Sequence, residues 1–157
     1  MANTFTRARP EESRFYYHFI KVGAYISTAS ESFLPIAGAE NTRDTTSSTG
    51  GSENLVFVAP YDGTLIKAII RSEEACDSTV LNWYRDATPT GAEIPPTMSA
   101  AQAVTVDMAV DDTSYEFDFT GGTNDFDTGD IMMWGFDPTN TPYDTHMVIV
   151  LKFDVTT

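Results

Sequence analysis

The stretch AVTVDMAVDDTSYEFDF, residues 103–119, alternates apolar and polar side chains twice, with an acidic break between the two runs. Alternation with a period of two is typical of a strand that buries one face. The break, Asp111–Asp112, favours a hairpin turn because Asp side chains bond to nearby backbone. Metal ligation by this pair is the alternative. The stretch therefore predicts two half-buried strands joined by a turn.

Similar apolar runs recur along the chain at intervals of about ten residues, separated by Gly, Pro and Asp. The further strands are predicted at 15–26, 54–59, 63–72, 78–85, 129–136 and 145–155, with a helix as the alternative for the aromatic run 15–26. Together these runs predict an all-β fold, a two-sheet antiparallel jelly-roll-like sandwich of about eight strands with an extended N-terminal arm. The predicted core is Val56, Val58, Ile66, Ile70, Val104, Val106, Phe117, Phe119, Trp134, Ile149, Leu151 and Phe153.

The organisation of the chain changes near residue 53. Residues 41–53 are almost all small and polar, which is typical of a loop. We therefore expect an N-terminal arm and Thr/Ser/Gly-rich loop over 1–53, which contributes at most one strand, and a β-sandwich domain over 54–157.

Composition excludes several classes of protein. The 157 residues carry 23 acids and 9 bases, a net charge of −14, which argues against binding to nucleic acid. One cysteine, Cys76, cannot form an intrachain disulfide, and Glu73 and Glu74 beside it are expected to raise the pKa of its thiol. The start has no apolar leader, and the longest aliphatic run is 147–151, so neither a signal peptide nor a membrane span is expected.

Candidate catalytic and metal-binding groups are few. Asp125, Asp127 and Asp130 could present oxygens to Ca²⁺, but their spacing is not that of an EF-hand, and a turn before the next strand is the simpler interpretation. His18 and His146 lie in separate predicted strands, and no G-x-S-x-G elbow or phosphate loop is present. We therefore expect no enzyme activity and no cofactor.

The aromatic residues suggest a second kind of site. Trp83, Tyr84 and Trp134 could form a platform for a sugar. Trp134 is assigned to the core, because Met132 and Phe136 share its face. One of Trp83 and Tyr84, which point to opposite faces, is expected to be exposed or at an interface.

The basic residues are concentrated at the N-terminus. Residues 1–21 carry a net charge of +2 and the rest of the chain −16. Tyr and Arg are favoured anchors at interfaces, so this segment is the predicted partner-binding site, with a place as the first core strand as the alternative. The residues concerned are Arg7, Arg9, Arg14, Phe15, Tyr16, Tyr17, Phe19 and Lys21.

Two strings, VFVAPYDGTLIKAIIRSE (56–73) and FDTGDIMMWGFDPT (126–139), resemble small jelly-roll proteins of tailed bacteriophage particles. The resemblance is to capsid decoration or cement proteins and to virion fibre-head domains. It implies a structural virion protein on the outer surface of the capsid, folded in the host cytoplasm and binding the major capsid protein. A fibre head that recognises a host glycan is the alternative.

A homo-oligomer is also expected, with a trimer favoured. Apolar residues on both faces at 131–136 and 146–150 exceed what one core interface needs. Identical chains usually close into cyclic assemblies.

Overall fold

The computed structural model describes residues 14–34, 36, 56–86 and 100–155, and these form strands, turns and loops. The predicted all-β sandwich is confirmed, and 15–26 is a strand rather than a helix. No helix of the described residues is long and apolar enough to cross a membrane. The strands are β1 Arg14–Ile26, β2 Ser32–Phe33, β3 Phe57–Val58, β4 Gly63–Ser72, β5 Asp77–Asp86, β6 Ala100–Met108, β7 Ser114–Asp118, β8 Asp125–Phe126, β9 Ile131–Asp137 and β10 Tyr143–Val155.

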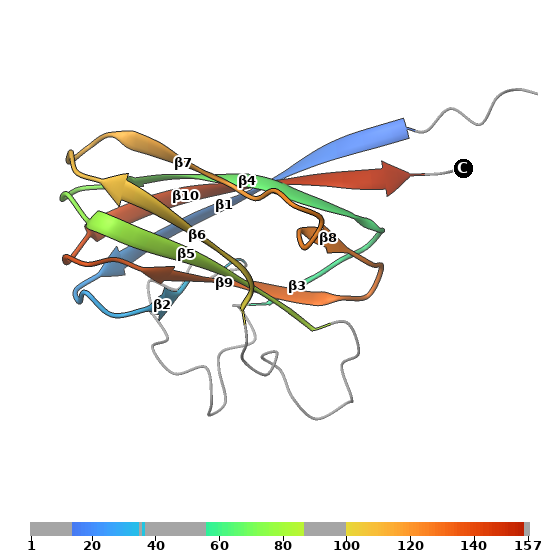
Figure 1. Cartoon of the computed structure of the whole chain (residues 1–157), viewed down its shortest axis with the longest axis horizontal. Coiled ribbons are helices and arrows are strands. Elements are labelled where there is room, and N and C mark those ends of the chain that lie inside the picture. Colours follow the sequence, from blue (N-terminus) through green and yellow to red (C-terminus); the bar gives the residue numbers. More distant parts are fainter. Residues whose placement is uncertain (1–13, 35, 37–55, 87–99, 156–157) are drawn as a thin grey trace, which may run out of the picture.

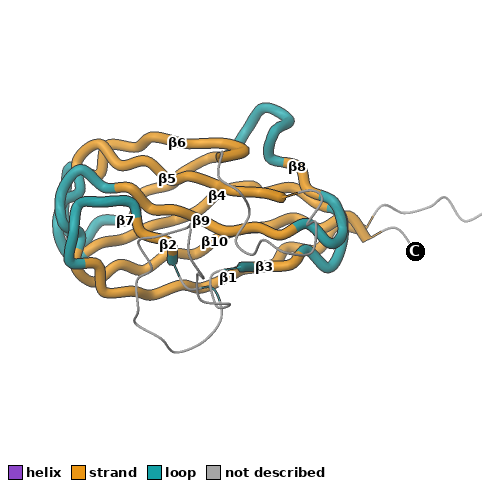
Figure 2. The backbone as a smooth tube through the Cα atoms, turned by 90° about the horizontal axis from the view of Figure 1, so that it is seen from below, coloured by secondary structure: helices purple, strands orange, loops and turns teal. Residues whose placement is uncertain are grey.

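Two antiparallel sheets pack face to face (Figures 1 and 2). The first, here called the β10 sheet, has the order β1-β10-β4-β7, with β8 beside β4. The second, the β9 sheet, has the order β2-β9-β5-β6, with β3 beside β9. The described residues form ten strands, where about eight were expected for the chain. The two additional strands, β2 and β8, contain two residues each and are too short to show alternation.

Strand β1 is part of the β10 sheet over its whole length. It pairs antiparallel with β10 from Arg14 opposite Val155 to Ile26 opposite Tyr143. Its inward side chains join the same core cluster as those of 56–155, so one core draws on both sides of residue 53. Residues 1–13 and 37–53 of the expected arm and loop lie outside the described residues.

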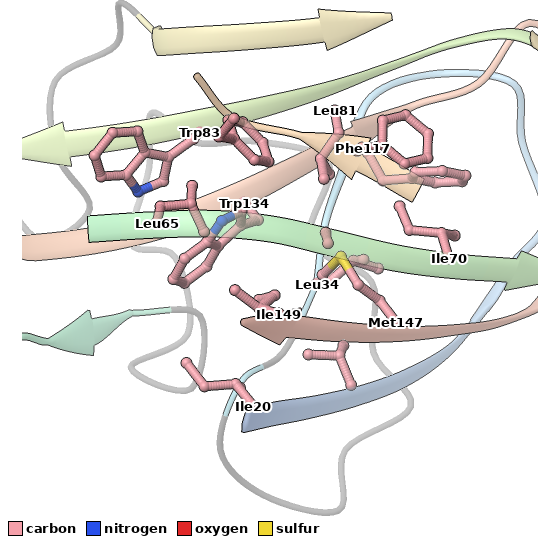
Figure 3. Packing of buried hydrophobic residues seen from close by; sticks show 14 of the residues in the cluster. Ile20, Leu34, Leu65, Ile70, Leu81, Trp83, Phe117, Trp134, Met147 and Ile149 are labelled. Carbon is pink, nitrogen blue, oxygen red and sulfur yellow. The ribbon is translucent and has the colours of Figure 1, made fainter. Parts of the chain in front are cut away.

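The core fills the space between the two sheets. Trp83 and Trp134 from the β9 sheet pack with Leu65 and Ile149 from the β10 sheet (Figure 3). Most of the predicted core is confirmed. Ile70, Phe117, Phe119, Trp134, Ile149, Leu151 and Phe153 are buried, and Val104 and Val106 are half-buried against the cluster.

The prediction for Val58 is wrong. Its side chain is 57% exposed, whereas Ala59 is buried and Phe57 packs against the core. The inward set in this segment is therefore shifted by one residue, which moves every side chain to the opposite face. Val56, predicted on the same face as Val58, is half-buried.

Ile66 is half-buried rather than fully buried because β4 contains a bulge. Lys67 lies opposite Val150 and Leu65 lies opposite Leu151, so Ile66 is the extra residue between them. A bulge reverses the alternation of faces. The inward residues are consequently Leu65 before the bulge and Ala68 after it.

Leu151 is fully buried in the middle of the β10 sheet. We expect Leu151→Ala to lower the free energy of unfolding by ~2–5 kcal/mol, because the lost side chain leaves a cavity. Urea unfolding followed by circular dichroism measures this. A loss well under 1 kcal/mol would contradict the packing described for Leu151.

Candidate functional site

Exposed large apolar side chains gather on strand β1. Among the described residues, five of the nine belong to it: Phe15, Tyr16, Tyr17, Phe19 and Tyr25. Four of these five are among the predicted partner-binding residues, and the structure brings them onto one strand. Exposed apolar clusters of this kind mark interaction surfaces.

The pleat of the strand determines which β1 side chains are exposed. Ile20, Val22, Ala24 and Ile26 point into the core, so the residues between them point to solvent. Phe19, Lys21 and Tyr25 are therefore outward. Because the face with Ile20 and Val22 is buried, the opposite face of β1, which carries the aromatic side chains, is presented to solvent.

β1 is also an edge strand. Among the described residues it pairs only with β10, so alternate backbone N–H and C=O groups along its other side have no strand partner there. The strand contains no Pro, and Lys21 is the one charged residue after Arg14. A long edge without these blocking features can accept a strand or a surface from another chain.

The N-terminal end of β1 and the C-terminal end of β10 project together beyond the second sheet (Figure 1). We call 14–17 with its partner 152–155 the β1 tip. Tyr16 lies on the inward side of the strand but is 59% exposed, so the tip presents aromatic rings on both faces. On the outer side, the Lys152 Nζ lies 3.5 Å from the centre of the Phe15 ring.

The base of the β1 tip is ordered by aromatic packing. His18 stacks on Phe57 with ring centres 5.9 Å apart, and it also meets Phe153. Phe153 contacts the rings of Tyr61 and Phe126 as well. The exposed end therefore rests on a packed support that connects both sheets.

Of the basic residues in the predicted site, two lie outside the described residues and two lie on β1. Arg7 and Arg9 lie outside the described residues. Arg14 opens β1 opposite Val155, and Lys21 is exposed in the middle of the strand.

Two of the three carboxylates considered for Ca²⁺, those of Asp127 and Asp130, contact an arginine, whereas the Asp125 carboxylate accepts a hydrogen bond from Thr64 Oγ1 at 2.9 Å. Arg85 Nε donates to Asp130 Oδ2 at 2.6 Å, its Nη2 lies 3.3 Å from Asp127 Oδ2, and its Nη1 donates to the Asp125 carbonyl oxygen. The Asp127 backbone N–H also donates to Asp130. Arg85 supplies the positive charge, and the turn interpretation of this segment is confirmed. No group of His, Cys, Asp and Glu within the described ranges could hold a metal ion.

The pair Asp111–Asp112 forms the predicted turn between β6 and β7. Asp112 has a φ of +52°, in the left-handed region that Asp tolerates. Its carboxylate accepts a hydrogen bond from Arg71 Nη2 at 2.9 Å.

The prediction that Trp83 or Tyr84 is exposed is wrong, because both are buried. Trp83 lies in the central core, whereas Tyr84 lies on the outer side of the β9 sheet, where it packs with Phe33 and Met133. Trp134 is buried as predicted, so these three side chains do not form the sugar platform that was considered for them. The Phe33 segment also covers Met133, which accounts for part of the apolar surplus at 131–136.

A small polar network borders this second cluster. Glu31 Oε1 accepts hydrogen bonds from Tyr84 Oη at 2.7 Å and from Asn82 Nδ2 at 2.8 Å. A Cβ at Gly135 would overlap the Glu31 carboxylate, so any larger residue there would force the Glu31 side chain to move out of this network. Burial raises the pKa of Asp137, and the negative charge of Glu31 raises it further.

His146 lies apart from His18, in a shallow polar groove of about 340 Å³ on the outer side of the β10 sheet. Arg71, Ser72, Glu73, Asp112 and Asp144 complete its lining. The ring of Tyr25 lies beside that of Tyr143, at 5.9 Å between centres. Tyr25 pairs with Asp144 across the strands, so this aromatic pair adjoins the groove.

Cys76 is fully buried. Burial is the main cause that raises the pKa of its thiol, and the neighbouring charge of Asp77 adds to it. Glu74 contributes its backbone carbonyl, which accepts from the Cys76 Sγ at 3.3 Å. The expected direction of the shift is confirmed, with burial as its main cause rather than the charges of Glu73 and Glu74.

Comparison with known proteins identified no matching family model and no matching curated protein.

The Arg85–Asp130 pair is expected to be structurally important because the Asp130 side chain is only 3% exposed. Arg85→Met would leave a buried carboxylate without its cation and should cost about 3 kcal/mol of unfolding free energy. Arg71→Met is the matched control, since its exposed pair with Asp112 should be worth less than about 1 kcal/mol. Equal losses in urea unfolding would contradict this assignment.

Asp137→Asn should raise the melting temperature at neutral pH. The folded protein holds the pKa of Asp137 above its unfolded value, so the ionised carboxylate opposes folding. This destabilisation by ionised Asp137 is fully present above the pKa that Asp137 has in the folded protein. It disappears as the pH falls through that pKa and the carboxylate takes up a proton. Melting curves across a pH series should therefore show a gain that shrinks towards acid. A variant less stable than the parent at neutral pH would contradict this.

Proposed function

We propose that this chain is a structural protein of a phage particle that decorates the capsid and binds it through the β1 tip. The observation that carries the proposal is the exposure of aromatic rings on both faces of that tip. The proposal also uses the likeness of 56–73 and 126–139 to capsid decoration proteins.

Charge supports the choice of this end of the molecule. The first 21 residues are net basic and the remainder is strongly acidic. An acidic capsid surface would repel most of the body but attract this segment. The partner in this proposal is the major capsid protein, and the contact residues are Arg7, Arg9 and the β1 tip.

Phe15 and Tyr17 have large exposed rings that can be buried in a partner without disturbing the core. Lys152 already restrains the Phe15 ring, which lowers the entropy lost when the tip binds. A tip of this construction is suited to lasting attachment rather than to turnover of a substrate.

The location of the chain on the particle tests this function. Immunogold labelling with an antibody against the full chain should place gold over the whole head. Gold confined to the tail tip, or particles without label, would contradict capsid decoration.

The tip itself is tested by variants. Tyr17→Ser should weaken cosedimentation with purified heads by about tenfold, as expected for an aromatic anchor. Val110→Ser, an equally exposed apolar residue in the β6–β7 turn, is the control and should bind as the parent chain does. Equal binding by both variants would contradict a contact through the tip.

A second candidate is a fibre-head domain that binds a host glycan. The exposed Tyr25–Tyr143 pair beside the polar groove favours it, because rings stack on sugars while carboxylates and Arg71 bond to hydroxyls. Tyr143 has a φ of +54°, a conformation that bulky residues adopt at a cost. Gold at the tail tip, together with loss of glycan binding in Tyr25→Ala, would support this candidate.

A further inference from the structure

We infer that the outer face of the β10 sheet binds a second copy of this chain, with the β1 side of one copy packed on the β7 side of the other. This inference concerns a different surface from the β1 tip and does not depend on the role at the capsid. It rests on the exposed apolar side chains of that face and on the distribution of its charges.

Apolar side chains run across the outer face in neighbouring register positions. Phe19 lies opposite Val150, and Lys21 lies opposite Val148, which in turn lies opposite Ile69 of β4. Phe19 is 58% exposed, Val148 and Ile69 are half-buried, and Val150 is buried beneath its neighbours. The surplus expected at 146–150 is located here, and the described residues place no second layer over Phe19.

The outer face is less acidic than the rest of the chain. It carries four of the nine bases but only seven of the 23 acids, among them Glu73 and Asp112 of the groove and Asp125 of β8. The bases are Lys21, Lys67, Arg71 and Lys152, and the other acids are Glu116, Asp118, Asp144 and Asp154. A net charge of −14 opposes contact between two copies, and that repulsion is weaker at a face with a smaller excess of acids.

The two sides of the face also differ in sign. The β1 side carries Phe19 and Lys21, whereas the outward residues of β7 include Glu116 and Asp118. Glu116 accepts a hydrogen bond from Lys67 Nζ at 2.8 Å, which is the main cause that raises the pKa of Lys67, and the charge of Asp118 adds to it. A second copy that lays its β1 side on β7 brings Lys21 to these acids and covers Phe19.

Because the β1 side of one copy meets the β7 side of the next, the contact can repeat from copy to copy and close into a ring. The trimer expected from the sequence is one such ring.

Sedimentation equilibrium of the full chain tests the inference. We expect a mass that is a whole multiple, two or greater, of the 17.2 kDa chain at micromolar concentration. Phe19→Ser and Lys21→Glu should each weaken self-association by about tenfold or more. Both changes are on exposed side chains, so far-UV circular dichroism should show an unchanged sandwich.

Val58→Ser is the matched control, because Val58 is as exposed as Phe19 but belongs to the β9 sheet. It should keep the mass of the parent chain. The inference would be overturned if the parent chain were monomeric at about 100 μM, a concentration at which even an association with a dissociation constant of that order would be visible. Folded Phe19→Ser that keeps the parent mass would overturn it equally, and neither result bears on head binding by the tip.

Discussion

The antiparallel pairing of β1 with β10 is the contact on which the rest of the structure depends. It places the last strand of the chain at the centre of a sheet and closes one margin of the core with side chains from near the N-terminus. Because strand side chains alternate, the same pairing turns Phe19 and Lys21 outward. Core stability and the exposed surface thus arise from one backbone arrangement.

The long strands could be predicted from the sequence because one face of each is buried and the alternation is regular. β10 and β7 show this most clearly, and both have the predicted inward sets. The prediction failed where local geometry breaks the alternation, at the Ile66 bulge and in the two-residue strand that contains Val58. A bulge depends on the register against a partner strand, which a single segment does not reveal.

The candidate site was predictable in part. The aromatic and basic composition of 14–21 identified the strand, but not which of its rings would be exposed. The Arg85–Asp130 contact joins residues 45 positions apart, so the acidic run by itself suggested Ca²⁺. The expectation that Trp83 or Tyr84 is exposed failed because the residue that covers Tyr84, Phe33, belongs to a strand too short to detect in the sequence.

The two proposed contacts divide the exposed surface of β1 between partners. The tip, with rings on both faces, is suited to insertion into a capsid surface, while the flat face around Phe19 is suited to another sandwich. Phe15, Tyr17 and Phe19 in these contacts are residues that the fold cannot bury once Ile20 and Val22 face inward. A structural role explains this exposure without any loop or cofactor.

The central claim, that the sandwich requires β1, is tested most directly by a shortened chain that starts at Gly51. Without β1, the core loses Ile20, Val22, Ala24 and Ile26, and β10 becomes an exposed edge. Guanidinium unfolding monitored by circular dichroism should show no cooperative transition for this chain. A transition as steep and as stable as that of the full chain would contradict the account.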